Sequence, residues 1–435
     1  MISEGILAYI SVYKELNVGL DRLALDYVHL FSDKFFYLFL YIGCFISLIY
    51  LAMSLVTVKK DEEREEALDS KKVPFVTVQI PTMNEIIALR CAKKCLQLDY
   101  PKDKYEILIG DDSNDPSVSK KLDEFARKHS KVKIIRRESN EGFKPGNLNN
   151  MLKHTKGEII AIFDSDFIPD KDFLKRIVAP FNDKKVSAVQ SRWKFINADK
   201  NMVTALASSI VYTFHYVSLS LLKKFGFCFL CGSAEAVRKS DLIKWGGWRS
   251  GSLTEDIEYS LRIHKHGKKI FYLPGLQCFN EAPTRPFDLY KQQMRWAYGV
   301  VSAYKVHTKD ILTSRLISGK QKLFTMLGAF GYLLPIILIM IFIFGAMTLV
   351  TTRPAPIDWA RFFSETTRNV LLTSGLLVAN SIALYRARKI KLLPKVLLSS
   401  FSLGLVVTYF VNVGIVKAII NKPMKWFLLK KSTRV

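Results

Sequence analysis

The sequence predicts an α/β domain with a mostly parallel sheet, inserted between membrane-spanning helices. Uncharged apolar runs stand near both ends of the 435-residue chain, and the segment between them alternates short apolar runs with amphipathic stretches. Such alternation is typical of strands and helices that build a parallel sheet covered on both faces. Polar side chains follow the short apolar runs, and the carboxyl ends of parallel strands share one edge of the sheet, where ligands bind.

Four uncharged runs predict the membrane segments: Phe35–Val58, Leu323–Thr352, Asn369–Tyr385 and Val396–Val416. Three of them are long enough to cross a bilayer as a helix. Asn369–Tyr385 is close to the minimum spanning length, so a buried soluble helix is the alternative there. We therefore expect an integral, multi-pass protein of the cell membrane, in contact with membrane lipids.

Lys and Arg crowd the ends of these runs, in a chain whose formal net charge is +25. By the positive-inside rule they place the segment Lys59–Lys322 in the cytosol. No nucleic-acid motif accompanies the basic surplus, so we expect anionic lipids and a phosphorylated substrate as partners, and no nucleic acid. Three C-terminal crossings would leave the basic tail outside, against this rule. Either the last run does not fully cross, or the run around Pro335 is not a simple span.

These patterns divide the chain into seven expected segments. They are an N-terminal interfacial segment (1–34), a transmembrane helix (35–58), a charged linker (59–72), a cytosolic α/β domain (73–289), interfacial helices (290–322), a C-terminal transmembrane region (323–420) and a basic tail (421–435).

Short apolar runs predict the strands of the cytosolic domain at Val76–Pro81, Tyr105–Gly110, Val132–Arg137, Ile159–Phe163 and Val186–Gln190, and helical spacing predicts helices at Ile86–Gln97 and Val118–His129. The uncharged stretch Asn201–Leu222 is long enough to span a membrane, but it contains His215 and many hydroxyl residues. We expect a helix packed on the domain or lying at the lipid headgroups.

Six cysteines do not make a disulfide framework, because most fall in the membrane or in the segment assigned to the reducing cytosol. Cys228 and Cys231 have the spacing of one zinc-binding pair. No second pair accompanies them and their surroundings are apolar, so we expect no zinc site.

Asp164 and Asp166 follow directly on the apolar run Ile159–Phe163. Two carboxylates at the carboxyl end of a buried strand supply the hard oxygen ligands that a divalent cation with bound phosphates requires. An acidic turn before a helix is the alternative when Asp-Ser-Asp is considered alone. The motifs elsewhere in the chain favour the cation site.

Glu255 and Asp256 precede a helix that the spacing of Ile257, Leu261 and Ile263 predicts. A carboxylate held in a cleft can accept a proton from a hydroxyl group, which is the role of a general base. A helix-capping box is the alternative. His264 and His266 in the same helix would face different sides, so we do not expect them to bind a metal.

Gln292, Arg295 and Trp296 lie within one turn of a predicted helix, so Gln292 shares a face with Arg295 or Trp296. A guanidinium group binds phosphate oxygens in pairs, and an indole ring offers a flat apolar surface to a sugar ring. An amphipathic helix with its Trp at the headgroup level is compatible with this interpretation.

Five motifs, taken in order along the chain, resemble the membrane-bound family 2 glycosyltransferases, which include cellulose, hyaluronan, chitin and mannan synthases and ceramide glucosyltransferase. The resemblance covers about Val73 to Gly299 and implies a GT-A domain, which is Rossmann-like and binds a nucleotide-sugar. The motifs are Asp112, Lys144-Pro145-Gly146-Asn147-Leu148-Asn149, Asp164-Ser165-Asp166-Phe167, Thr254-Glu255-Asp256 and Gln292-x-x-Arg295-Trp296.

The resemblance implies a role for each matching residue. A UDP- or GDP-sugar donor would be held by Glu85, Asp112, Lys144, Gly146, Asn147, Asp164 and Arg295. Asp164 and Asp166 would bind Mn²⁺ or Mg²⁺. Asp256, with Glu255 beside it, would be the catalytic base and would give inversion at the anomeric carbon. The acceptor end would be lined by Gln292, Trp296, Cys231 and Gly232.

The stretch Gln190-Ser191-Arg192-Trp193, with Asn197, is most similar to the β-mannan and β-glucan synthase branch. The resemblance therefore implies a β-linked polysaccharide product of the glucan, mannan or hyaluronan kind, with passage of the product through the membrane as a further expectation. Transfer of one sugar to a lipid acceptor and a non-catalytic membrane scaffold are the alternatives. Glu235 and Arg238-Lys239 depart from the family pattern in the acceptor-side segment.

Overall fold

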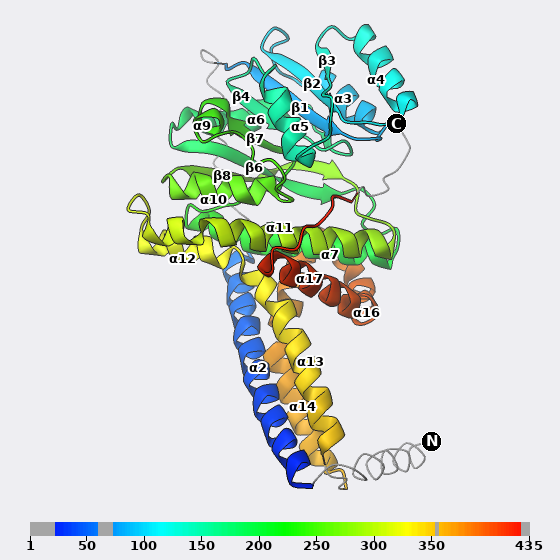
Figure 1. The fold of residues 1–435 in the computed structure, drawn as a ribbon, viewed down its shortest axis with the longest axis vertical. Helices are drawn as coiled ribbons and strands as arrows, with labels where there is room; N and C mark the ends of the chain where they lie inside the picture. The colour runs from blue at the N-terminus through cyan, green and yellow to red at the C-terminus, as the bar shows by residue number, and fades with distance from the viewer. Residues whose placement is uncertain (1–21, 60–72, 353–355, 428–435) are drawn as a thin grey trace. The chain divides into compact units, whose positions relative to one another are not determined.

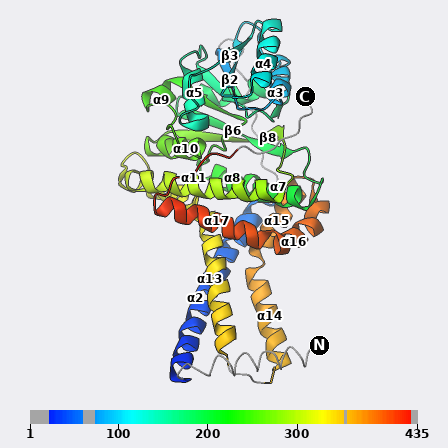
Figure 2. The ribbon, with the colours of Figure 1, turned by 45° about the vertical axis from the view of Figure 1, so that its right-hand side comes forward.

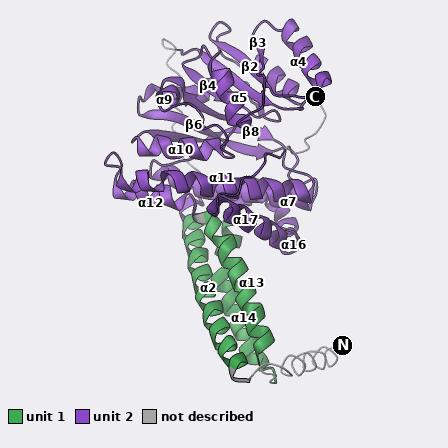
Figure 3. Ribbon diagram, in the orientation of Figure 1, with its two compact units in different colours: residues 1–55, 331–379 green, residues 56–330, 380–435 purple. Residues whose placement is uncertain are grey.

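The structure is a computed structural model that describes residues 22–59, 73–352 and 356–427. Most of the expected interfacial segment over 1–34 and most of the charged linker over 59–72 lie outside the described residues. The chain divides into two compact units, one made of residues 1–55 and 331–379 and the other of residues 56–330 and 380–435 (Figure 3).

The first unit is built from long apolar helices. Helices α2 (Arg22–Thr57) and α13 (Leu333–Thr351) are each long and apolar enough to cross a membrane, and they fall on the predicted runs Phe35–Val58 and Leu323–Thr352. In place of one helix over 369–385, the chain forms α14 (Trp359–Thr373) and α15 (Gly375–Arg386). At the break between them, the Gly375 N–H donates to Ser47 Oγ over 2.8 Å.

The second unit is organised around an eight-stranded mixed sheet of order β3-β2-β1-β4-β7-β6-β8-β5 (Figure 1). Strands β3, β2, β1 and β4 run parallel, as expected. The other half departs from the expectation of a mostly parallel sheet, because β7 is antiparallel to β4 and β6, and β5 is antiparallel to β8. The strands are β1 (Val76–Thr82), β2 (Tyr105–Asp111), β3 (Val132–Ile135), β4 (Ile159–Ile162), β5 (Ile168–Pro169), β6 (Val186–Phe195), β7 (Glu235–Arg238) and β8 (Lys269–Asn280).

The five strands predicted from apolar runs correspond to β1, β2, β3, β4 and β6. Every residue of β1, β2 and β4 is buried, which explains their nearly continuous apolar sequences. Buried faces of this kind require cover, and helices on the sheet provide it. The helices joined to the sheet strands are α3 (Ala88–Leu96), α4 (Pro116–Lys128), α5 (Phe143–Leu152), α6 (Phe173–Val178), α9 (Lys239–Lys244) and α10 (Glu255–Lys265).

The uncharged stretch Asn201–Leu222 packs on this unit. It forms α7 (Met202–Thr213), a π-helical turn (Phe214–Ser218) and α8 (Leu219–Lys224). Length and composition alone would let the Met202–Lys224 helix span a membrane, but 78% of its apolar window is buried inside the structure. The interpretation of this stretch as a helix packed on the domain is therefore confirmed.

Four further helices complete the second unit. They are α11 (Pro286–Thr313), α12 (Gly319–Leu327), α16 (Leu393–Ser402) and α17 (Gly404–Ile419). Helix α17 lies alongside α11 (Figure 1, Figure 2), and a Cβ atom on Gly414 of α17 would come within 2.4 Å of Met294 O. The straight crossing expected over Val396–Val416 is bent by 60° between α16 and α17. This bend agrees with the expectation that one C-terminal run is not a simple span.

Candidate active site

A cavity of about 740 Å³ opens in the second unit, at the ends of several sheet strands. Its walls include residues from the segments after β1 and β4, from the start of α10 and from α11. The structure thus brings together motifs that are far apart in the sequence. The charged residues that line the cavity are Glu85, Arg90, Lys144, Asp164, Asp166, Lys200, Glu255, Asp256, Glu281, Arg285 and Arg295.

Asp164 and Asp166 lie on the same wall of this cavity, directly after β4. The Asp164 side chain is 31% exposed, and its backbone N–H donates to Ser233 Oγ over 2.8 Å. Asp166 is buried, and its Oδ2 accepts a hydrogen bond from the backbone N–H of Glu281. Both carboxylates therefore face the cavity from fixed positions at the end of a strand.

Lys144 connects the two acidic groups of the cavity. Its ammonium group lies 2.8 Å from Asp164 Oδ1 and 2.9 Å from Glu255 Oε1, and it donates to Gly232 O over 2.5 Å. Burial lowers the pKa of Lys144, but the surrounding carboxylates outweigh this effect and raise that pKa above its ordinary value. The side chain is therefore a fixed positive charge between the strand-end carboxylates and the start of α10.

Asp256 has the electrostatic properties of a general base. Burial raises its pKa to about 7, and the negative charge of Glu255 adds to this effect, while Lys144 and Arg295 oppose it. A carboxylate with a pKa near neutrality is partly ionised at physiological pH and still basic enough to take a proton. Glu255, at 3% exposure, is held by its ion pair with Lys144.

Helix α11 brings Gln292, Arg295 and Trp296 to the cavity. Arg295 donates to the backbone carbonyl of Leu253 over 3.0 Å, which ties α11 to the segment just before α10. The two helices approach closely because residue 299 is a glycine. A Cβ atom there would lie 2.4 Å from Thr254 Cγ2.

Cys231 and Gly232 line the cavity beside Asp256. Gly232 has φ +85°, and an added Cβ would lie 3.3 Å from Asp256 Oδ2 and 3.6 Å from Lys144 Nζ. A left-handed conformation in so narrow a space favours glycine. Gly232, which was predicted to line the acceptor end, therefore contacts Lys144 through its carbonyl and leaves no room for a side chain beside Asp256.

Three of the predicted donor-side residues do not line this cavity. Asp112 forms a two-point ion pair with Arg137, whose Nε and Nη2 atoms lie 2.8 Å and 2.6 Å from its carboxylate oxygens. Gly146 faces a second, shallow surface depression. Asn147 is buried, and it donates to the carbonyl of Gly110 over 2.9 Å. Gly146 and Asn147 therefore support the surrounding loops in this structure.

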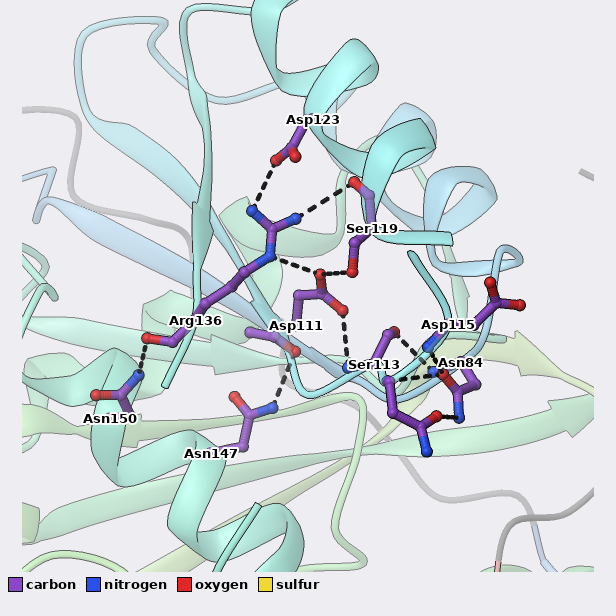
Figure 4. A network of polar contacts seen from close by, with 11 residues as sticks. Asn84, Asp111, Ser113, Asp115, Ser119, Asp123, Arg136, Asn147 and Asn150 are labelled. Carbon is purple, nitrogen blue, oxygen red and sulfur yellow. Dashed lines mark hydrogen bonds and ion pairs between the residues drawn. The ribbon is translucent and has the colours of Figure 1, made fainter. Parts of the chain in front are cut away.

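Asp111, which no motif in the sequence indicated, organises the loop after β2 (Figure 4). Its carboxylate accepts hydrogen bonds from Ser113 N, Ser119 Oγ and Arg136 Nε. Burial pushes the pKa of Asp111 upward, but these hydrogen bonds outweigh burial and lower it. Asn84, with φ 54°, accepts from the N–H groups of Asn114 and Asp115 and so joins the loops after β1 and β2.

Two aromatic residues of the C-terminal tail, Trp426 and Phe427, also line the cavity, and no motif in the sequence predicted this. The Trp426 ring lies 4.2 Å from the guanidinium carbon of Arg295 and stacks with Phe143 at a centroid distance of 6.2 Å. Met424 of the same tail packs with Leu253 and Met294. The only signal in the sequence was an aromatic pair in an otherwise basic tail.

Residues 74–299 match the family described as glycosyltransferase like family 2. The chain is 31% identical over 363 residues to probable glucomannan 4-beta-mannosyltransferase 3 of Arabidopsis thaliana, a match that covers 75% of this chain and 64% of that protein. It is 30% identical over 387 residues to glucomannan 4-beta-mannosyltransferase 7 of the same plant, covering 79% of this chain and 68% of that protein. The chain thus spans just under two thirds of the length of the first of these relatives.

Among solved structures, the chain is similar to the mannosyltransferase PcManGT from Pyrobaculum calidifontis in complex with GDP-Man and Mn²⁺. The TM-score is 0.64 at 19% sequence identity, and the match covers 92% of this chain and 99% of that chain. This likeness confirms the expected α/β architecture of the GT-A kind.

Proposed function

The chain belongs to glycosyltransferase family 2, and from this membership we propose that it is a membrane-bound inverting hexosyltransferase that extends a β-linked glycan from a nucleotide-diphosphate sugar. The observation that carries the proposal is the convergence of Asp164, Asp166, Asp256 and Arg295 on one cavity. That cavity holds the acidic, basic and aromatic groups that sugar transfer requires. We place the catalytic unit on the cytosolic side of a multi-pass protein, where nucleotide-sugars are available.

We favour a GDP-mannose donor and a β-mannan-type product. The relatives carry the name glucomannan 4-beta-mannosyltransferase, and the similar solved structure holds GDP-Man. The cavity volume of about 740 Å³ is in the range of pockets that bury a ligand of this size. The guanine base and the phosphates of the donor would lie along Thr82, Met83 and Glu85, which line the same cavity.

The residues present fit a divalent cation. Asp164 and Asp166 offer two carboxylates on one wall, and within the described residues no group of three or more His, Cys, Asp or Glu side chains forms a closed metal cage. Mn²⁺ and Mg²⁺ are commonly held by one or two carboxylates together with substrate phosphates and water. Such a cation would supply positive charge to the diphosphate when the donor is bound.

In the proposed mechanism, Asp256 accepts the proton of the acceptor hydroxyl while that oxygen attacks the anomeric carbon on the face opposite the diphosphate. The donor's glycosidic C–O bond breaks, and its electron pair leaves with the diphosphate. Attack from the opposite face inverts the configuration, so an α-linked donor gives a β-linked product. Burial and Glu255 keep the pKa of Asp256 near 7, which suits this proton transfer.

Lys144 and Arg295 would stabilise the negative charge that develops on the leaving diphosphate. Both are held before any ligand binds, Lys144 by Asp164 and Glu255, and Arg295 by the carbonyl of Leu253. Fixed donors of this kind stabilise a transition state without having to reorganise during the reaction. Trp296 and Gln292 on the same helix would contact the acceptor sugar.

Transfer of one sugar to a lipid acceptor is the second candidate. One wall of the cavity is apolar and includes Phe195, Ile196, Ala207 and Val211, the last two from α7. A surface of this kind suits a hydrocarbon chain as well as the C–H face of a sugar. The size of the product distinguishes the two candidates.

The decisive experiment uses the full-length protein, purified in detergent or nanodiscs, with a panel of GDP- and UDP-sugars and with Mn²⁺ or Mg²⁺. Nucleotide release reports donor turnover, and chromatography of radiolabelled product reports its length and linkage. We expect turnover with GDP-mannose and a β-linked oligomer or polymer. A lipid bearing one sugar would support the second candidate, and no turnover with any donor would contradict the proposal.

A further inference from the structure

Glu235 is a buried carboxyl group that the proposed mechanism does not use. It is the first residue of β7, where it is paired with Ile162 of β4 and Gln190 of β6, and it is 1% exposed. Its Oε2 atom accepts hydrogen bonds from the backbone N–H of Gly232 over 2.9 Å and of Cys231 over 3.2 Å. The side chain therefore folds back onto the turn that precedes its own strand.

The turn from Cys231 to Ala234 has a conformation that needs support. Gly232 has φ +85° and Ala234 has φ +49°, so a residue with a side chain also lies in the left-handed region. Such conformations persist where the surrounding contacts hold them. Glu235 is the side-chain acceptor for the N–H of Gly232 and shares the N–H of Cys231 with Gln190 Oε1, which lies closer, at 2.7 Å. Gln190 Nε2 also donates to the carbonyls of Ser233 and Ala234, and Trp193 Nε1 donates to Ser233 O.

The same turn touches both halves of the catalytic cavity. On the donor side, Ser233 Oγ accepts from the backbone N–H of Asp164 over 2.8 Å. Lys144 donates to Gly232 O over 2.5 Å, which helps to hold its ammonium group between Asp164 and Glu255. On the acceptor side, the Cα of Gly232 is close enough to the base that an added Cβ would lie 3.3 Å from Asp256 Oδ2.

We propose that Glu235 is a positioning residue: by holding the N–H group of Gly232, it fixes the residue whose carbonyl helps to place Lys144 between the donor-side and acceptor-side carboxylates. Its catalytic consequence rests on the proposed function. Glu235 itself does not touch the reacting atoms and acts through the backbone of the turn and through Lys144.

The amide isostere separates hydrogen bonding from charge. Burial raises the pKa of Glu235 well above its ordinary value, and the nearby negative charge of Asp256 adds to this, while Lys144 opposes it. The neutral acid is thus favoured, and its carbonyl oxygen can accept both N–H groups. Glu235→Gln keeps such an oxygen and should preserve the turn, whereas Glu235→Ala removes the acceptor and should release it.

Glu106→Ala is a matched control. Glu106 is also a buried strand glutamate, 6% exposed on β2, and it accepts hydrogen bonds from Thr77 Oγ1 and from the backbone N–H of Lys156. It does not line the catalytic cavity. Its removal should lower the stability of the fold without changing the turn or the pH dependence of activity.

The first measurement is independent of activity. Hydrogen–deuterium exchange of the peptide that covers Phe229–Ala234 reports whether the N–H group of Gly232 remains protected, while the N–H of Cys231 keeps its hydrogen bond to Gln190 Oε1 in every variant. We expect faster exchange in Glu235→Ala, and exchange as in the wild type for Glu235→Gln and Glu106→Ala. Wild-type protection of this peptide in Glu235→Ala would overturn the proposal.

The second measurement is the pH profile of kcat with the donor that the wild type uses. Asp256 is faced by Glu255 from α10, Lys144 from α5, Arg295 from α11, the Cys231 thiol from the turn and Glu235 from β7. Because burial favours the neutral form of Glu235, its removal takes no negative charge away from Asp256. In the wild type, the positive charge of Lys144 lowers the pKa of Asp256. Displacement of Lys144 should therefore raise that pKa. We therefore expect Glu235→Ala to lose roughly 100-fold in kcat and its acid limb to move to higher pH.

Glu235→Gln should keep the pH profile of the wild type and a kcat within about threefold of it, because the amide oxygen still accepts the hydrogen bond that fixes the turn. Loss of that hydrogen bond would lower kcat far more. An unchanged kcat and profile in Glu235→Ala, or equal impairment in Glu235→Gln, would overturn the proposal. If the wild type transfers no sugar at all, the proposed function fails, and the exchange measurement still decides whether Glu235 holds the turn.

Discussion

The indole ring of Trp426 faces the guanidinium group of Arg295, with the guanidinium carbon 4.2 Å from the ring centroid. The contact joins the C-terminal tail to the helix that brings Gln292, Arg295 and Trp296 to the cavity. A cation–π contact of this kind fixes the plane and position of the guanidinium group. The tail is therefore part of the cavity wall that would meet the donor.

Replacing Trp426 with alanine should weaken donor binding. A cation–π contact of this kind is worth about 1 kcal/mol, so the KM for the nucleotide-sugar should rise roughly fivefold, with a smaller change in kcat. Steady-state kinetics of nucleotide release measure both constants. Trp426→Phe retains an aromatic face and serves as the control. A KM in Trp426→Ala equal to that of the wild type would show that the ring does not position Arg295.

Replacing Asp256 with asparagine should abolish transfer while leaving donor binding in place. The amide cannot accept the hydroxyl proton, and general-base catalysis contributes roughly 1,000-fold to such reactions. Donor turnover and binding of the nucleoside diphosphate by calorimetry measure the two effects separately. Transfer at more than about a tenth of the wild-type rate would exclude Asp256 as the base.

The pH dependence of kcat should reflect the ionisation of Asp256. Its pKa is raised to about 7, so kcat should fall as the pH drops below 7, because the protonated acid cannot accept a proton. Glu255→Gln removes a charge that raises this pKa and should shift the acid limb to lower pH. Lys144→Met removes a charge that lowers it and should shift the limb to higher pH. Shifts in the same direction for both variants would contradict this electrostatic account.

Asp166→Asn should weaken binding of the divalent cation. Loss of one of two protein carboxylates should raise the dissociation constant for Mn²⁺ about tenfold or more in the presence of nucleoside diphosphate. Electron paramagnetic resonance of free Mn²⁺ measures this directly, and excess Mn²⁺ should partly restore turnover. Asp170→Asn changes a nearby, exposed carboxylate and should leave Mn²⁺ binding unchanged. Equal effects of the two substitutions would argue against a cation site at Asp166.

Gly299→Ala should separate α11 from the start of α10. The added methyl group would lie 2.4 Å from Thr254 Cγ2 and 2.5 Å from Thr254 Oγ1, so the helices must move apart. Overpacking of this kind costs about 1–3 kcal/mol of stability and would displace Arg295 relative to Asp256. The melting temperature, measured by thermal unfolding, and kcat should both decrease. Gly319→Ala adds the same methyl group where nothing lies within 4 Å and should change neither quantity.

The sequence predicted the centre of the site because its residues follow buried strands or begin helices. Asp164 and Asp166 come directly after an apolar run, and Glu255 and Asp256 begin a helix with clear periodicity. The shared edge of a parallel sheet then predicts their convergence. The antiparallel strands β5 and β7 were not predicted, since β5 has only two residues and the four residues of β7 begin with Glu235 and end with Arg238 instead of forming an apolar run.

Long-range side-chain pairing could not be predicted. Asp111 and Asp112 are adjacent at the end of β2, and only the fold shows that Arg136 binds one and Arg137 the other. Trp426 lies in a segment that its composition marks as a basic tail, and its contact with Arg295 depends on the path of the chain after α17. Such contacts depend on geometry that no local spacing specifies.

The ammonium group of Lys144 has consequences for anyone who wishes to redesign this enzyme. It contacts Asp164 on one side and Glu255 on the other, so under the proposed function one side chain would affect both donor binding and the pKa of Asp256. A library that varies position 144 to broaden the range of donors will therefore also shift the pH optimum of each variant. Screening such a library at a single pH would discard active variants.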